Sequence, residues 1–356
     1  MPAEPPESPP RSVTIYDVAA AAGVSPSTVS RAFSRPGRVS ASTAERIRRI
    51  AADMGYRIHS SSQAQPIGRT SIIALVVADV TNPFYNEIVG GAESALAEAD
   101  FTMLLANTHG SGPLEREALE RAIPVVEGIV LATTIMPDSA IRMIAKQRPT
   151  VVLNRAVSDV PSIVTDIPGG TRRAVEHLAE LGHHTITYAA GPEESWTDGM
   201  RWRALRQAAL DLRLQGRRIG PFAATVTGGA HAADELVRHP TSAVITYNDQ
   251  MAIGLIRRLT HLRVGVPDKV SVIGFDNIFP AELVTPPLTT LAAPLRAMGA
   301  AAVRTLLAMI HGAHPRIGDP TVLPVRLVVR ESTAQRNRQR SDHLRVATSS
   351  PPPHDN

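Results

Sequence analysis

From Ser71 onward, short apolar runs alternate with longer amphipathic segments. The runs have the length and residue types of strands, whereas the longer segments repeat their apolar residues with the period of a helix. Strands alternating with helices predict parallel sheets joined by crossover helices. We expect strands at 72–77, 102–106, 129–131, 151–153, 185–189, 243–246 and 270–273, with helices such as 86–98, 171–181 and 250–259 between them. Because this region is too long for one such layer, the sequence predicts an α/β body of two doubly wound lobes.

The segment TIYDVAAAAGVSPSTVSRAF, which precedes the lobes, has the pattern of two short helices around a tight turn. Thr14 is a suitable N-cap for the first helix, and Asp17 three residues later completes a capping box. Gly23 ends this helix, and Ser25 and Pro26 then suit the start of a second one. Two helices joined so closely predict a helix-turn-helix, whose second helix enters the major groove of DNA.

A third helix and a positive charge complete this head. Ser40 or Ser42 is expected to cap the third helix, and Gly55 to end it. Residues 11–59 hold eight arginines and three acidic residues, a balance of 8 − 3 = +5, whereas residues 60–335 carry −1. This asymmetry is expected where a head meets phosphate, although a solvated basic face has the same charge.

Composition excludes several classes of protein. No apolar run approaches the roughly 20 residues of a membrane helix. The first ten residues, MPAEPPESPP, lack the basic and apolar regions of a secretion signal, and we read them as a disordered arm. We therefore expect no membrane partner and a cytoplasmic location. The absence of cysteine excludes disulfides and thiolate zinc sites.

The sequence contains no recognisable enzyme motif. There is no Walker loop, no G-x-G-x-x-G that opens a helix, no G-x-S-x-G and no H-E-x-x-H. His183 and His184 follow Gly182 at a helix end, where we expect capping or packing histidines. We therefore expect no catalytic residue, no metal and no cofactor.

VTIYDVAAAAGVSPSTVSRAF, followed by VSASTAERIRRIAADMGYR, resembles the head of the lactose-repressor (LacI/GalR) family of bacterial transcription regulators. The blocks ALVVADVTNPFYNEIVGGAE, VEGIVLAT, HLAELGHHTITYAAGP, ITYNDQMAIG, VSVIGFDN and PPLTTLAAP resemble family blocks in the same order. The resemblance implies a helix-turn-helix head on a body like the periplasmic sugar-binding proteins. It also implies a homodimer that binds double-stranded operator DNA and a small-molecule effector.

The predicted domains follow from these patterns and from the family's three crossings between lobes. They are a disordered arm (1–10), the helix-turn-helix domain (11–57), a linker (58–70), the effector-binding and dimerisation body (71–335) and a disordered tail (336–356). Within the body, the N-lobe is expected at about 71–165 and 291–321, and the C-lobe at about 166–290 and 322–335. Helix residues such as 86–97 are a candidate dimer surface.

The resemblance also assigns DNA contacts. Outward residues at the start of the second helix read bases in the family, which here means Pro26, Ser27 and Arg31. Arg31 can make a two-point hydrogen bond to guanine, whereas the other two suit shape or thymine-methyl contacts. The positions that resemble phosphate contacts are Thr14, Tyr16, Ser25, Thr28 and Ser30.

The linker departs from the family pattern. Relatives have Pro-Asn after Tyr-Arg and then a short helix whose leucine wedges into the minor groove. Here Ile58 and His59 replace Pro-Asn, Gln65 stands where that leucine aligns, and Pro66 follows it. Gln65 hydrogen-bonding in the minor groove and a simple flexible tether remain two open interpretations.

Residues at strand ends are candidates for the effector site, because ligands of open α/β sheets bind there. Aromatic faces together with carboxylate, amide and guanidinium groups are suited to sugars. Positions that correspond to the family's effector contacts are Phe84, Tyr85, Arg201, Asn248 and Asp276, to which we add Asp79 and Trp196. An aromatic that some relatives have near Ala224 is absent, and only Phe222 is close.

The sequence therefore predicts a homodimeric transcriptional repressor whose operator affinity is switched allosterically by a small molecule, with a sugar as the favoured class. A sugar-binding receptor module without DNA function is the alternative. The basic helical head and the lack of an export signal favour the repressor.

Overall fold

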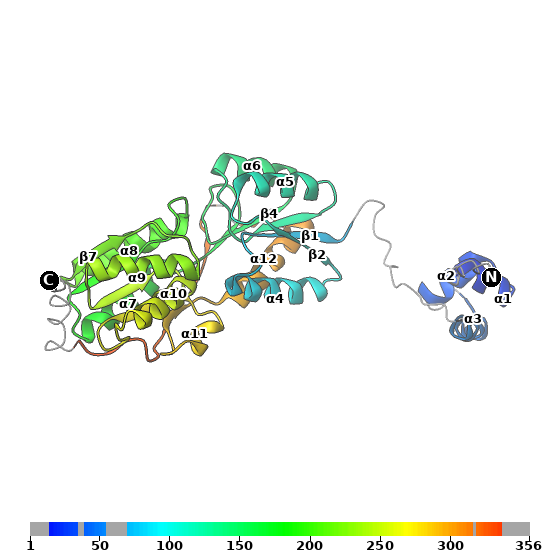
Figure 1. Cartoon of the computed structure of the whole chain (residues 1–356). Helices are drawn as coiled ribbons and strands as arrows, with labels where there is room; N and C mark the ends of the chain where they lie inside the picture. Colours follow the sequence, from blue (N-terminus) through cyan, green and yellow to red (C-terminus); the bar gives the residue numbers. More distant parts are fainter. Residues whose placement is uncertain (1–13, 35–38, 55–69, 316–317, 337–356) are drawn as a thin grey trace, which may run out of the picture. The chain divides into compact units, whose positions relative to one another are not determined.

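The structure is a computed structural model of the chain, which describes residues 14–34, 39–54, 70–315 and 318–336. The chain divides into two units, 1–69 and 70–356, and each is described by itself (Figure 1).

The first unit, the head, consists in its described residues of three helices: α1 (Ile15–Ala22), α2 (Pro26–Ser34) and α3 (Ala41–Asp53). Each helix contributes to a small core of fully buried side chains: Val18, Val29 and Ile47. Helix α1 begins as predicted, because Asp17 Oδ2 accepts hydrogen bonds from the Thr14 amide at 2.7 Å and from its hydroxyl at 2.6 Å.

The two turns of the head follow local chemistry. Gly23 ends α1 with a left-handed backbone (φ 64°), a conformation that glycine adopts without steric cost. Of the two predicted caps for α3, Ser40 is the one used, and its Oγ accepts from the Thr43 amide at 3.3 Å. Gly55, the predicted end of α3, lies outside the described residues.

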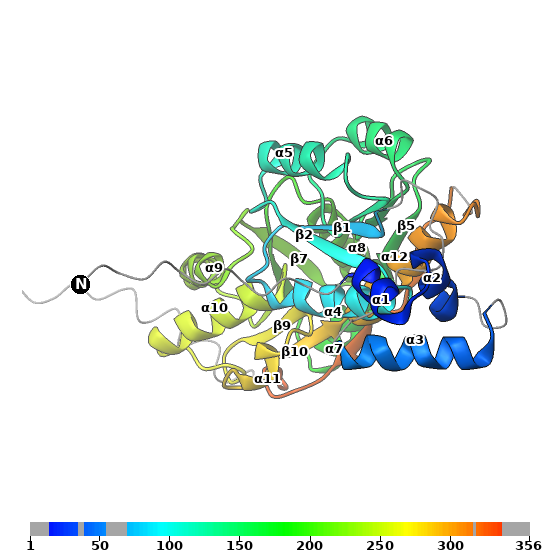
Figure 2. The same cartoon turned by 90° about the vertical axis from the view of Figure 1, so that its right-hand side faces the viewer.

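In the second unit, the body, the first lobe is built on a six-stranded sheet of order β11-β5-β4-β3-β1-β2, all parallel. Helices α4 and α12 cover one face and α5 and α6 the other, an arrangement visible in both views (Figure 1, Figure 2). Its elements are β1 (Ile72–Val77), α4 (Pro83–Ala97), β2 (Thr102–Asn107), α5 (Gly112–Ala122), β3 (Gly128–Leu131), α6 (Asp138–Gln147), β4 (Thr150–Leu153), β5 (Ser162–Thr165), α12 (Leu295–Ile310) and β11 (Thr321–Leu323).

The second lobe repeats this architecture on a sheet of order β12-β10-β9-β8-β6-β7, in which only β12 is antiparallel to its neighbour. Helices α9 and α10 pack on one face and α7 and α8 on the other. Its elements are α7 (Ile167–Glu180), β6 (Thr185–Ala189), α8 (Trp196–Asp211), β7 (Gln215–Ile219), α9 (Val226–Arg238), β8 (Ala243–Thr246), α10 (Asp249–His261), β9 (Ser271–Asp276), α11 (Pro280–Leu283), β10 (Thr289–Ala292) and β12 (Arg326–Val328).

The chain passes between the two sheets three times: after β5, after β10 and between β11 and β12. Strand β10 runs to Ala292 in the second sheet, and β11 runs to Leu323 in the first, because pairing with β9 and β5 respectively continues to those residues.

His183 packs inside the second lobe. Its Nδ1 lies 2.9 Å from Ser242 Oγ, and its Nε2 lies 3.1 Å from Ser271 Oγ and 3.2 Å from the carbonyl oxygen of Ala334. Burial lowers the pKa of this imidazole. This is the packing role predicted for it, and it ties the end of the described chain to the sheet.

No helix among the described residues has both the length and the apolar character required to cross a bilayer.

Candidate functional site

Most of the predicted DNA contacts that the structure describes are exposed, and only Pro26 and Thr28 are partly buried. Tyr16 is 70% exposed at the start of α1, which is unusual for a large aromatic residue. On α2, Ser27, Ser30 and Arg31 are exposed, and Pro26 occupies the first position. These side chains are therefore available to a ligand. Gln65 lies outside the described residues.

Hydroxyl groups organise the first turn of α2. Ser25 Oγ accepts from the Thr28 amide at 3.3 Å and lies 2.9 Å from both the Ser27 and the Thr28 hydroxyl oxygens. The N-terminus of α2 thus presents three hydroxyl groups together at the positive end of the helix dipole, an arrangement that suits a phosphate oxygen.

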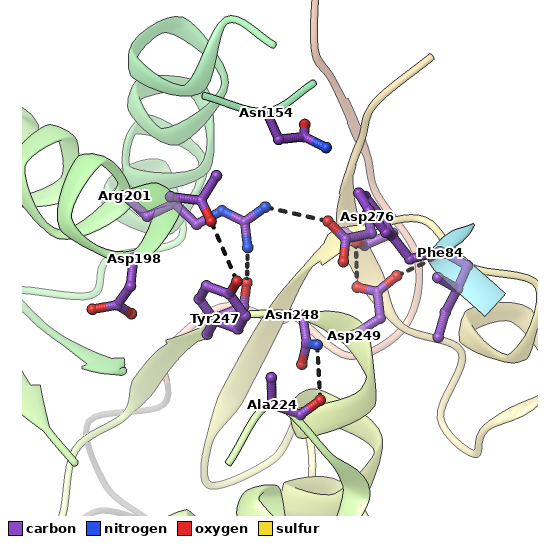
Figure 3. Close-up of polar contacts among 12 residues, drawn as sticks. Phe84, Asn154, Asp198, Arg201, Ala224, Tyr247, Asn248, Asp249 and Asp276 are labelled. Carbon is purple, nitrogen blue, oxygen red and sulfur yellow. Dashed lines mark hydrogen bonds and ion pairs between the residues drawn. The ribbon is translucent and has the colours of Figure 1, made fainter. Parts of the chain in front are cut away.

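In the body, two of the predicted effector residues, Arg201 and Asp276, form an ion pair, and Arg201 lies on α8. Its Nη2 donates to Asp276 Oδ1 at 3.2 Å, and its Nη1 donates to the carbonyl oxygen of Tyr247 (Figure 3). The guanidinium carbon lies 4.1 Å from the ring centroid of Phe275 and 4.9 Å from that of Tyr247. The residue is only 8% exposed, and its Nε has no hydrogen-bond partner among the described residues. The structure thus holds a buried cation between two rings with one donor left over.

Asp276 ends β9 in an unusual backbone conformation. Its φ is 105° and that of Asn277 is 58°, both in the left-handed region that side chains disfavour. Burial raises the pKa of the Asp276 carboxyl, and the nearby Arg201 opposes this shift. Strained residues of this kind are concentrated at functional sites, which supports a role for this turn.

A second carboxyl, that of Asp249, lies beneath the first. Its Oδ1 accepts from the Thr290 hydroxyl at 2.5 Å, and its Oδ2 accepts from the Ile278 amide at 2.9 Å. Burial raises its pKa well above the usual range, and the charge of Asp276 adds to this effect. Asp249 therefore supports the Asp276 turn from inside the lobe.

Asn248 has both ends of its side chain engaged within its own lobe. The Oδ1 atom caps α10 by accepting from the Met251 amide at 2.9 Å, and Nδ2 donates to the carbonyl oxygen of Ala224 at 3.2 Å. This predicted effector residue is thus also a structural residue that joins the start of α10 to the chain before α9.

The first lobe contributes aromatic residues to the same region. Phe84 and Tyr85, at the start of α4, make an edge-to-face contact with ring centroids 5.0 Å apart. Tyr85 is buried and hydrogen-bonded to Thr133; burial raises the pKa of its phenol, and Asp276 and Tyr247 of the other lobe act on that phenol electrostatically. Figure 3 draws Phe84 together with Arg201 and Asp276, so side chains from both lobes lie in this region.

The two residues added to the family positions have local roles. Asp79 Oδ1 accepts from the Thr81 amide at 2.9 Å and from its hydroxyl at 2.7 Å, which shapes the turn before α4. Trp196 is half-buried at the first position of α8. Neither residue is among those that contact the Arg201–Asp276 pair.

Three residues near the site were not predicted. Asp198 is buried on α8 and accepts from the Tyr188 hydroxyl at 2.8 Å. Tyr247 and Asn154 directly follow strands β8 and β4, and Figure 3 draws both with Arg201 and Asp276. The rule that ligands bind at strand ends points to both positions, whereas no simple signal distinguishes Asp198 from other helix carboxylates.

Comparison with known proteins finds relatives of both the head and the body. The model of "Bacterial regulatory proteins, lacI family" matches residues 14–58, and that of a "Periplasmic binding protein-like domain" matches residues 175–333. The HTH-type transcriptional regulator DegA of Bacillus subtilis strain 168 is 33% identical over 335 residues, which cover 91% of this chain and 99% of DegA.

Two solved structures cover nearly all of this chain. The lac repressor dimer bound to operator and the anti-inducer ONPF has a TM-score of 0.79 at 26% identity, over 91% of this chain and 100% of that one. The complex of the transcriptional regulator CelR with cellobiose has a TM-score of 0.67 at 30% identity, over 90% of this chain and 99% of that one.

Proposed function

This chain belongs to the LacI family of bacterial transcription regulators, which are DNA-binding proteins and not enzymes, and we propose that it is a homodimeric repressor controlled by a sugar bound beside Arg201 and Asp276. The head would bind operator DNA in the cytoplasm. The body would hold the sugar between its two lobes.

The observation that carries the effector proposal is the buried Arg201–Asp276 pair. Guanidinium and carboxylate groups donate to and accept from the hydroxyls of a sugar, and the ring of Phe84 offers an apolar face for its C–H groups. The unpartnered Nε of Arg201 represents a cost that a ligand oxygen would offset, if a small movement of the side chain brought the two together. The cellobiose in CelR and the family's periplasmic binding protein-like body support a sugar as the ligand class.

The DNA proposal rests on the exposed side of the head. Arg31 is exposed on α2 and has the length to reach a guanine edge, whereas Tyr16 and the hydroxyls around Ser25 suit the phosphate backbone. The operator in the lac repressor structure supports this use of the head.

An exposed apolar pair supports the homodimer. Phe279, directly before α11, is 73% exposed, and Leu283, the last residue of α11, is 66% exposed; their spacing of four places the two side chains near one another. In contrast, the exposed residues of the predicted surface 86–97, such as Glu87 and Glu93, are largely polar. We therefore propose that α11 contributes to the dimer contact; the lac repressor to which this chain is similar is itself a dimer.

A short series of hydrogen bonds links the effector pair to α11. Nη2 of Arg330 donates to Asn277 Oδ1 at 2.8 Å and to Glu282 Oε1 at 2.7 Å. Asn277 follows Asp276, and Glu282 lies on α11 beside the exposed pair. A sugar that favours one arrangement of this turn would shift the dimer between two states by its difference in affinity for them.

The test combines two titrations on the full-length chain. First, sugars are screened for a rise in melting temperature, because a ligand that binds only the folded state stabilises it by mass action. Second, DNA fragments enriched by the protein from a random pool are titrated with and without each stabilising sugar. We expect at least one sugar to raise the melting temperature and to change DNA affinity. Sugar binding without any DNA binding would favour the receptor alternative, and the absence of both would refute the proposal.

A further inference from the structure

Tyr247 fills space on the second-lobe side of the proposed effector site. Its ring packs directly on the backbone of Gly191: a Cβ atom added to that glycine would lie 2.5 Å from Cγ of the tyrosine and 2.6 and 2.7 Å from its two Cδ atoms. No side chain fits between them. The lack of a side chain at Gly191 therefore leaves the space that the tyrosine ring occupies.

The phenol oxygen of Tyr247 is held as firmly as the ring. It lies 3.0 Å from Ser195 Oγ and 3.3 Å from Thr197 Oγ1, and these two oxygens lie 2.8 Å apart. The three hydroxyls form a triangle that closes the space between the end of β8 and the first turn of α8. Because Ser195 also accepts from the Asp198 amide at 3.3 Å, the triangle is anchored to the helix.

Tyr247 also determines the position of the effector-site cation. Its carbonyl oxygen accepts from Nη1 of Arg201, and the guanidinium lies over its ring. The wall formed by Tyr247 and the hydroxyls of Ser195 and Thr197 thus stands beside the Arg201–Asp276 pair. Tyr247, directly after β8, supplies an aromatic residue in a chain that lacks the aromatic some relatives have near Ala224.

We propose that Tyr247 sets the size of the effector, and that the site accepts a single sugar ring and excludes a disaccharide. This inference rests on the proposed sugar-binding function and goes beyond it to the ligand's size. The physical reason is steric. The bulky phenol and its hydroxyl partners stand beside Arg201, and a second ring that extended towards them would have to displace them and break several hydrogen bonds.

The experiment measures size preference by calorimetric titration of the full-length chain. The probes are five monosaccharides (ribose, glucose, galactose, mannose and fructose) and three disaccharides (cellobiose, lactose and maltose). Wild type is compared with Tyr247→Ala, which removes the ring, and with Tyr247→Phe, which keeps the ring and loses the hydroxyl. We expect wild type to bind its best monosaccharide roughly 100-fold or more tightly than any disaccharide. Tyr247→Ala should reduce this ratio by about tenfold or more, whereas Tyr247→Phe, which keeps the ring packed on Gly191 and loses only the hydrogen bonds of the hydroxyl, should reduce it less.

The ratio separates a size filter from simple packing, because general damage to the lobe would weaken all sugars together. The inference is overturned if wild type binds a disaccharide as tightly as any monosaccharide, or if Tyr247→Ala leaves the ratio unchanged. If Tyr247→Ala does not fold, Tyr247→Ser takes its place with the same expectation. If no sugar binds to wild type or to either variant, the proposed effector class fails and this inference with it.

Discussion

Replacing Arg201 by methionine is the most direct test of the buried ion pair. Methionine is of similar length and apolar, so the change removes the charge while filling much of the same space. It leaves the Asp276 carboxyl buried, without its cation, and close to the carboxyl of Asp249. Both side chains of the pair are only 9% exposed, so solvent cannot replace the lost partner.

The expected loss follows from that burial. Breaking a buried ion pair by removing one partner typically costs about 3 to 5 kcal/mol of unfolding free energy, because an uncompensated charge remains. For a unit of this size about 2 °C of melting temperature corresponds to each kcal/mol, so Arg201→Met should lower the melting temperature by roughly 6 to 10 °C at neutral pH.

The loss should depend on pH with a definite sign. Without Arg201 the pKa of Asp276 rises further, because burial already raises it and only the cation opposes this shift. A carboxyl whose pKa is raised in the folded state does not lower the free energy of unfolding below its unfolded pKa of about 3.9. It lowers the free energy of unfolding as the pH rises through the folded pKa. The difference between wild type and Arg201→Met should therefore grow as pH increases from about 4.

The assay is thermal unfolding followed by circular dichroism between pH 4 and 8. Arg172→Met serves as the matched control, since Arg172 pairs with Asp211 at 2.8 Å on the surface and no measurable change is expected there. Adding Asp276→Asn to Arg201→Met should recover stability at neutral pH by removing the unpaired carboxylate. A melting temperature within 2 °C of wild type, or a loss that does not vary with pH, would refute the reasoning.

Three further predictions concern the head, a histidine and the dimer. Arg31→Ala should weaken binding to the selected operator by about 1 to 3 kcal/mol and binding to random DNA by much less. Arg49→Ala on α3 should weaken binding to both DNAs equally. Equal losses for Arg31→Ala would show that Arg31 contacts phosphate. Burial lowers the pKa of His183, so the unfolded chain binds more protons than the folded chain below about pH 6.5. The free energy of unfolding should therefore fall as the pH drops through that value. Chemical denaturation should show a shallower fall for His183→Gln. Phe279→Glu should shift the protein towards monomer in sedimentation experiments, while Leu210→Glu, at a site 71% exposed on α8, should not; an unchanged dimer would exclude α11 from the contact.

Much of the fold could be predicted because the central strands are apolar on both faces. Strand β8 is fully buried along its length, and β1 is buried from Ile73 onward, so they read as continuous apolar runs. The edge strand β7 was not predicted, because its sequence QGRRI faces solvent at most positions. Its strand conformation comes from pairing with β6, a contact that leaves no apolar pattern in the strand itself.

The candidate site could be predicted only in part. The resemblance pointed to Arg201 and Asp276, which lie 75 residues apart in the chain and pair directly. The role of Tyr247 depends on a glycine 56 residues earlier and on two hydroxyls at the start of α8. A pattern local to β8 contains none of this information, because the space that the ring fills is created by the chain after β6 and by the start of α8.

Two features that suit this site to a ligand would destabilise an ordinary protein core. A buried guanidinium with an unpaired donor and a carboxyl on a left-handed backbone both cost folding free energy, and an apolar interior of the same shape would avoid that cost. The neighbouring residues limit the cost: two rings flank the cation, and Asp249 holds the strained turn through Thr290 and Ile278. Asn277 follows Asp276 in the chain, and its side chain and Glu282 of α11 both accept hydrogen bonds from Arg330. A ligand bound to the Arg201–Asp276 pair would therefore act on a turn that is joined to the exposed surface of α11. Binding energy at the site is thus available to favour one arrangement of the body over another, which is what a regulator requires.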